Sequence, residues 1–354
     1  MSTADIESSQ KPQTRRQAGY PATTRRFDLL ATALAAWVVI GIFVDVNAHN
    51  HGQVDDTFFT PWHFLLYSGV LANGVLFGMV QYRNVGRGYA WAKAVPRGYM
   101  LSFVGVLIFA LAGGFDFVWH SLFGFEVNLE ALLSPAHLLL ATGGMLFVLG
   151  PLRAQWGRRT ANGWRDLFPA LASATFALSL LTLFTQFANL ITQVDSVTGR
   201  FPPGGSRSLW DSAIASAVLI PAVLISATLL LLVRRWSLPR GAVTFVLVVN
   251  ALLMFYLRLE YIREEWPVLL AAVIAGIIGD GLVAWRQPSI QRVGALRLFA
   301  FAVPLTYFLS LFLILLLTSG VWWSIHMWLG TVVMAGVTGF GLSYLVAPPA
   351  VPDA

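Results

Sequence analysis

The chain has 354 residues, of which 57% are hydrophobic and only 11% are charged, and its mean hydropathy is +0.69. Soluble domains carry roughly 25% charged residues, so the composition excludes an ordinary soluble enzyme and indicates a protein embedded in a lipid bilayer. The absence of cysteine excludes thiolate metal sites, disulfides and covalently attached c-type haem. The net charge of +6 comes without long basic runs, so nucleic acid is not expected as a partner.

Apolar runs of about 20 residues are long enough to cross the ~30 Å hydrocarbon core of a bilayer as helices. Each such run must be helical, because an isolated apolar strand would leave its backbone hydrogen bonds unmade in lipid. Ten runs occur, at 27–47, 58–82, 98–119, 131–151, 168–193, 210–233, 241–261, 267–285, 296–319 and 322–346. We therefore predict an all-α polytopic membrane protein with about ten transmembrane helices.

Charged residues are distributed unevenly around these runs. Nineteen of the 23 Lys and Arg lie in the N-terminal tail or in the connections after even-numbered helices, whereas eleven of the 17 Asp and Glu lie on the opposite side. The positive-inside rule then predicts a multi-pass protein of a bacterial inner membrane with both termini cytoplasmic. Residues 1–26 and 347–354 are expected to be cytoplasmic tails, the first of them disordered. The acidic periplasmic face should attract cations.

One pattern of acidic and histidine residues occurs twice, at the outer ends of the first four helices. The first copy is Asp45-x3-His49, Asp56-x3-Thr60-Pro61-x-His63 and Gly69, and the second is Asp116-x3-His120, Glu130-x3-Ser134-Pro135-x-His137 and Gly143. Five of the six histidines lie in or beside these copies. We therefore divide the chain into a metal-binding region of two tandem helical hairpins, 27–151, and a further six-helix region, 152–346.

The local geometry of each copy brings its polar side chains together. Asp45 and His49 are four residues apart and share one face of a helix. Thr60 is a candidate N-cap and Pro61 suits the first helical position. The side chain of His63 tilts back toward the start of its helix. A hairpin would therefore bring one carboxylate and two imidazoles together and leave a coordination position open, and the second copy repeats this pattern.

These residues form the predicted metal sites. The ligands are expected to be Asp45, His49 and His63 in the first copy and Asp116, His120 and His137 in the second. Such sets suit copper, and zinc or iron as alternatives. Candidates for an extra ligand or for support of an imidazole are Asp56, Glu130, His51 and Glu126. The competing interpretation is that these are polar helix caps at the membrane surface, but ionisable groups beside hydrocarbon favour a functional role.

The stretch Asp45-Val-Asn-Ala-His49, followed by Asp56-Thr-Phe-Phe-Thr-Pro-Trp-His63, resembles the metal motif in the C-type subunit of the copper membrane monooxygenases. These are the particulate methane and ammonia monooxygenases, and the second copy stands where that family has a second, similar site. The resemblance covers about residues 40–145, and Asp116 replaces an amide of the family. It implies copper, oxidation of a small lipid-soluble substrate with O2, and cupredoxin-type and other membrane subunits as partners in a homo- or hetero-oligomer.

The leading hypothesis from the sequence is a copper-dependent oxidase or monooxygenase, or a subunit of one, related to this family as a divergent and longer member. No catalytic side chain besides the metal ligands stands out. The alternatives are a non-catalytic metal-binding or metal-handling protein, a transporter whose outer vestibule is this site, a bis-histidine haem protein and a zinc-binding hydrolase.

Overall fold

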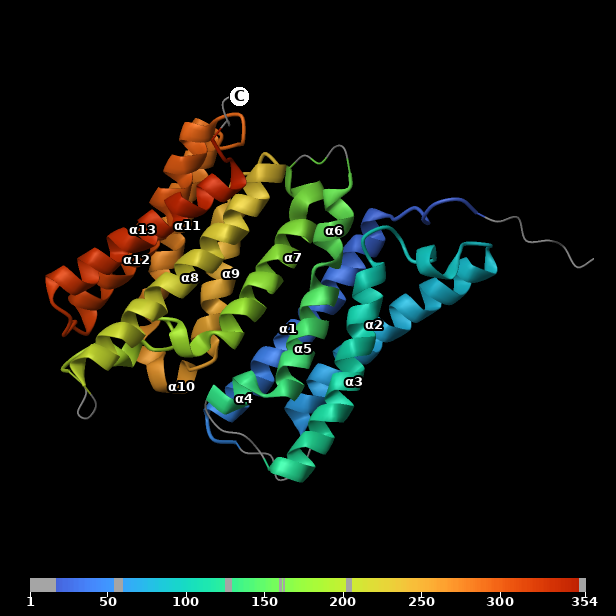
Figure 1. Cartoon of the computed structure of the whole chain (residues 1–354), viewed down its shortest axis with the longest axis horizontal. Coiled ribbons are helices and arrows are strands. Elements are labelled where there is room, and N and C mark those ends of the chain that lie inside the picture. The colour runs from blue at the N-terminus through green and yellow to red at the C-terminus, as the bar shows by residue number, and fades with distance from the viewer. Residues whose placement is uncertain are drawn as a thin grey trace, which may run out of the picture.

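A computed structural model describes residues 17–53, 60–124, 129–158, 161, 163–201 and 206–349. The described chain is a bundle of helices (Figure 1), with isolated β-bridges but no strand among these residues. The helices are α1 (Arg25–Asn50), α2 (Pro61–Gly86), α3 (Met100–Phe123), α4 (Leu129–Leu133), α5 (Pro135–Val148), α6 (Gly150–Trp156), α7 (Gly163–Phe184), α8 (Arg207–Arg235), α9 (Ala242–Tyr256), α10 (Leu259–Ile262), α11 (Leu269–Arg286), α12 (Val293–Thr318) and α13 (Ile325–Val346). Short 3-10 turns are η1 (Trp91–Lys93), η2 (Gln186–Ala188), η3 (Val194–Ser196) and η4 (Arg263–Val268).

The described residues contain nine helices that are long and apolar enough to cross a membrane. One of them is continuous over α5 and α6, from Pro135 to Trp156. The one remaining predicted run, 241–261, contains α9, which has 15 residues. At 1.5 Å per residue this helix is about 22 Å long, shorter than the hydrocarbon core. The prediction of an all-α polytopic membrane protein is confirmed.

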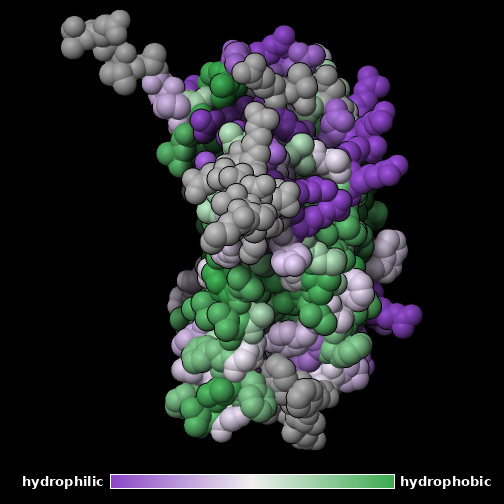
Figure 2. Space-filling model, turned by 90° about the vertical axis from the view of Figure 1, so that its right-hand side faces the viewer, coloured by the Kyte–Doolittle hydropathy of each residue, from purple (hydrophilic) through white to green (hydrophobic). Residues whose placement is uncertain are grey.

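The two ends of the bundle differ in polarity. The described start of the chain and the end of α13 lie at the same end (Figure 1). Figure 2 shows hydrophilic residues gathered at that end, above a broad band of hydrophobic side chains. The two described ends of the chain, at residues 17 and 349, therefore lie on one side of the band, whereas the assignment of that side to the cytoplasm rests on the distribution of Lys and Arg in the sequence.

The two predicted hairpins are present, because α1 packs on α2 and α3 packs on α5. The motif glycine of each copy lies where the helices approach closely. A Cβ atom on Gly143 would lie 2.7 Å from the backbone nitrogen of Phe109, and one on Gly69 would lie 2.9 Å from the ring of Trp37. Gly143 thus lets α3 and α5 pack backbone to backbone, whereas Gly69 makes room for the side chains of Trp37 and Val38.

Helix α7 connects the two halves of the bundle. It contacts α1, α5 and α6 on one side and α8 and α9 on the other (Figure 1). The predicted helix 168–193 is too long, because α7 ends at Phe184 and the turns η2 and η3 follow. The side-chain oxygen of Asn189 accepts a hydrogen bond from the backbone nitrogen of Ile191 at 3.0 Å. Such local bonds compete with the helical pattern, and they fold this segment against the end of the bundle that is opposite to the termini.

Candidate metal centre

The first Asp/His/His group lies where α1 ends and α2 begins. Thr60 caps α2, and its hydroxyl oxygen accepts a hydrogen bond from the backbone nitrogen of His63 at 3.2 Å. The Oδ1 atom of Asp45 lies 3.2 Å from Nε2 of His63 and 3.8 Å from Nδ1 of His49. The same Nδ1 atom lies 2.9 Å from the carbonyl oxygen of Asp45. The hairpin thus brings the three predicted ligands of the first copy together.

The second group repeats this arrangement at the junction of α3 and α5. The Oδ1 atom of Asp116 lies 3.4 Å from Nε2 of His120 and 3.5 Å from Nε2 of His137. One ligand atom from each of the three residues lies within 4.8 Å of the others. The predicted caps and prolines are also confirmed in this copy, because Ser134 caps α5 and Pro135 begins it.

The spacing of ligand atoms in the second group fits a four-coordinate ion. Bonds of about 2.0–2.1 Å in a tetrahedral arrangement place neighbouring ligand atoms about 3.3 Å apart, close to the observed 3.4 and 3.5 Å. Asp116 is only 3% exposed, and its Oδ1 atom accepts no hydrogen bond from any described residue. A buried carboxylate oxygen without a proton donor is costly. A cation held between the three side chains would remove that cost.

Hydrogen bonds at the Nδ1 atoms orient the imidazoles of this group. Nδ1 of His120 lies 3.2 Å from the carbonyl oxygen of Gly124, and Nδ1 of His137 lies 2.8 Å from the hydroxyl oxygen of Ser134. A proton on Nδ1 leaves the lone pair on Nε2, which is the atom that faces the carboxylate. Each ring is therefore set by a neighbour within four residues along the chain, so that Nε2 is free to act as a ligand.

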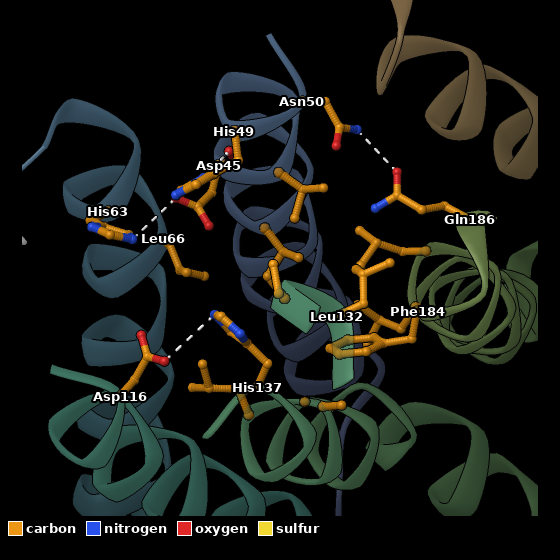
Figure 3. Close-up of a pocket in the computed structure, with 18 of the residues that line it drawn as sticks. Asp45, His49, Asn50, His63, Leu66, Asp116, Leu132, His137, Phe184 and Gln186 are labelled. Atoms are coloured by element: carbon orange, nitrogen blue, oxygen red, sulfur yellow. Dashed lines mark hydrogen bonds and ion pairs between the residues drawn. The ribbon is translucent and has the colours of Figure 1, made fainter. Parts of the chain in front are cut away.

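Both groups line a single cavity of about 620 Å³ (Figure 3). In Figure 3, Leu66 lies between the two Asp/His/His groups. Leu132 and Phe184 belong to the opposite wall of the cavity, which both groups face. Most other wall residues are aliphatic or aromatic and come from α1, α3, α5 and α7. The volume lies within the range of about 300–1,000 Å³ that is usual for small-molecule pockets. The two groups are therefore positioned to act on the contents of one chamber.

Of the four additional candidates, the two that the structure describes, Glu130 and His51, are not brought into these groups. Asp56 and Glu126 lie outside the described residues. Glu130 is exposed on α4, and no ion pair joins it to a histidine in the part of the chain that the structure describes. His51 ends α1, and its Nε2 atom lies 3.8 Å from Oε2 of Glu260 on α10. For Glu130 and His51 the structure therefore offers no contact with the predicted ligands.

Part of the cavity wall was not foreseen from the sequence. Nδ2 of Asn50 donates hydrogen bonds to Oε1 of Gln186 at 3.0 Å and to the carbonyl oxygen of Leu257 at 3.1 Å. Asn50, Gln186 and Arg258 all line the cavity. They come from the end of α1, from η2 and from the residue before α10, so no local spacing in the sequence links them.

Tyr67 lies beside both groups. Its ring centroid is 6.1 Å from that of His63, and it interacts electrostatically with both Asp45 and Asp116. A Cβ atom on Gly113 would lie 2.5 Å from the Tyr67 hydroxyl. The absence of a side chain at 113 thus allows this phenol to reach α3 from α2, and the two hairpins meet at this contact.

Comparisons of the chain with family models, with characterised proteins and with solved structures give no match. The resemblance to the copper membrane monooxygenases therefore rests on the motif residues. The structure shows helices that are long and apolar enough to cross a membrane, and an Asp/His/His group that could hold a metal ion.

Proposed function

We propose that this protein is a membrane metalloprotein that holds copper at the two Asp/His/His groups and oxidises a lipid-soluble molecule in the cavity they share, alone or as one component of a complex. The observation that carries the proposal is that two corresponding sets of one Asp and two His side chains, from two copies of one hairpin, line a single chamber, and that the second set has the spacing of a metal site. The motif resemblance over residues 40–145 favours copper over zinc or iron. The metal-binding face is proposed to be periplasmic.

The residues of the chain would have distinct roles in this function. Asp45, His49 and His63 would hold one ion, and Asp116, His120 and His137 the other. Copper supplies one-electron and O2 chemistry when bound. Each carboxylate would offset part of the charge of its ion. Three ligands per group would leave a position open toward the cavity, and the apolar wall would keep water from a reactive site.

A metal-handling protein without turnover is the second candidate, and one observation favours it. The side chains of Asp45 and His49 are 17% and 37% exposed, whereas those of the corresponding Asp116 and His120 are 5% and 13% exposed, and only the third pair reverses this order, at 12% for His63 and 28% for His137. The first group is thus the more accessible to ions from solution. A site that loads at an exposed group and passes metal inward would show the same gradient.

Oxygen consumption by the protein in lipid nanodiscs separates the two candidates. The copper-loaded protein is supplied with a quinol or ascorbate as reductant, and O2 uptake is recorded together with the EPR spectrum of Cu²⁺. The enzyme proposal expects uptake that is lost in His63→Ala or His137→Ala. His326→Ala is the matched control, because His326 is exposed at the start of α13, away from both groups. Stoichiometric copper without oxygen uptake would support metal handling instead.

A further inference from the structure

The cavity has a polar wall that is separate from both Asp/His/His groups. This polar wall consists of Asn50, Gln186 and Arg258. Figure 3 shows Asn50 and Gln186 across the cavity from His63 and Asp116, with apolar side chains in between. A molecule that filled the cavity would therefore meet amide and guanidinium groups at one end, hydrocarbon in the middle, and the proposed metal ions at the other end.

The polar wall has more hydrogen-bond donors than its protein partners use. Oε1 of Gln186 accepts from Asn50, but Nε2 of Gln186 donates to no other described residue, although this residue is only 8% exposed. Nε of Arg258 is buried and also donates to no described residue. The polar contacts of the Arg258 terminal nitrogens are long, at 3.4 Å to the carbonyl oxygen of Thr192 and 3.7 Å to Asp195, and the guanidinium also lies 5.2 Å from the ring centroid of Tyr261. Nε2 of Gln186 is accessible and Gln186 lines the cavity, so an acceptor inside the cavity would satisfy this donor. The wall is therefore suited to a ligand that supplies acceptors.

The size of the cavity also limits the ligand. A water molecule takes up about 30 Å³ of liquid volume, so a molecule of one or two heavy atoms would leave most of the 620 Å³ unfilled. A molecule with a hydrocarbon chain would fill the middle of the cavity, where Leu66, Leu132 and Phe184 lie. Burial of each methylene contributes about 0.8 kcal/mol. A ligand with a hydrocarbon chain could therefore bind with appreciable affinity.

We propose that the cavity binds an amphiphile whose hydrogen-bond-accepting head group, above all a carboxylate, is held by Gln186 and Arg258, and whose hydrocarbon chain extends toward the Asp/His/His groups. A guanidinium is cationic at every relevant pH and makes charge-assisted hydrogen bonds to carboxylates. The role of this molecule as a substrate rests on the proposed function, but its binding does not. The lipid-soluble molecule of the proposed function would then be a medium-chain amphiphile.

Equilibrium dialysis of radiolabelled octanoate tests the binding step. The full chain is placed in nanodiscs, stripped of metal, and compared with empty nanodiscs to subtract partitioning into lipid. One saturable site is expected in the wild type, and Arg258→Gln and Gln186→Leu should each weaken it by about tenfold or more, the loss typical of one charge-assisted hydrogen bond. Arg263→Gln is the matched control, because Arg263 is exposed in the adjacent turn and does not line the cavity.

Three results of the dialysis would overturn the proposal. The first is the absence of saturable octanoate binding by the wild type, and the second is unchanged binding by both wall variants. The third is binding of 1-octanol as tight as that of octanoate, which would exclude recognition of the head group. Because dialysis uses metal-free protein, a failure here leaves the metal sites untouched. Conversely, octanoate binding by a protein that takes up no copper would refute the proposed function and keep the amphiphile site.

The direction in which the hydrocarbon chain of the ligand lies in the cavity is tested with copper present. Octanoate carrying a terminal trifluoromethyl group should show ¹⁹F relaxation enhanced by Cu²⁺ in the wild type, because its tail lies near the ions. The enhancement should fall when His63→Ala and His137→Ala are combined. An enhancement that is stronger for a fluorine placed next to the carboxylate would mean that the molecule binds in the reverse direction, which contradicts the proposal.

Discussion

The hydroxyl oxygen of Ser134 lies 2.8 Å from Nδ1 of His137 and also accepts a hydrogen bond from the backbone nitrogen of that residue at 3.3 Å. One side chain thus caps α5 and sets the ring of a proposed ligand. A cap of this kind contributes to stability wherever it occurs, but here it is also coupled to the orientation of an imidazole. The two roles can be separated experimentally.

Ser134→Ala should weaken copper binding at the second group by about 10- to 100-fold, the usual effect of losing a partner that orients a ligand. It should also lower stability by about 1 kcal/mol through the lost cap. Copper titration and thermal unfolding in nanodiscs measure these effects. Ser206→Ala is the control, because Ser206 caps α8 in the same way with no histidine beside it. An equal loss of copper affinity in both variants would mean that the effect is only structural.

Asp116→Asn should change stability in opposite directions with and without metal. In the metal-free protein the amide removes a buried charge that lacks a hydrogen bond, so the unfolding temperature should rise. In the copper-loaded protein the loss of a ligand lowers affinity, and the stabilisation conferred by bound metal shrinks accordingly. Differential scanning calorimetry of the metal-free and copper-loaded forms of both proteins measures these opposite changes in unfolding temperature. A decrease of similar size in both forms would argue for a purely structural carboxylate.

Gly143→Ala should separate α3 from α5, because the new Cβ atom would lie 2.7 Å from the backbone nitrogen of Phe109. Overpacking of this kind costs about 1–3 kcal/mol. Since α3 carries two ligands of the second group and α5 carries the third, copper affinity there should fall with stability. Gly78→Ala on α2 is the control, because a Cβ atom on it meets no other atom within 4 Å. The unfolding temperature of the Gly78→Ala variant should stay unchanged or rise.

The orientation of the protein in the membrane can be tested with single cysteines, since the chain contains none. Arg200→Cys and Arg87→Cys place thiols at two exposed positions on opposite predicted sides of the membrane. A membrane-impermeant maleimide is applied to cells whose outer membrane has been permeabilised. It should label the cysteine at position 200 and should label the one at position 87 only after the inner membrane is disrupted. The reverse pattern would put the cavity on the cytoplasmic side.

The hairpins and their ligands were predictable because the signals are local and occur twice. The four-residue spacing of Asp45 and His49, and the cap and proline before His63, each fix a side chain relative to its own helix. Repetition at offsets of 71 and 74 residues distinguishes the pattern from a chance arrangement. The distances around Asp45 and Asp116 follow from that local geometry once each hairpin closes.

The polar wall could not be predicted, because tertiary contacts create it. Asn50 meets Gln186 across 136 residues of sequence and the carbonyl oxygen of Leu257 across 207. The prediction of one long helix to residue 193 also placed Gln186 within a membrane span. Apolar composition alone does not reveal that α7 ends at Phe184, nor that a local hydrogen bond of Asn189 holds the following segment in a non-helical turn.

Copper content per chain, measured on protein reconstituted in nanodiscs and dialysed against a weak chelator, decides whether the paired groups are metal sites. Two ions are predicted for the wild type, one for His63→Ala, one for His137→Ala and none for the double variant. Copper content that is the same in all four proteins, or negligible in the wild type, would contradict the assignment.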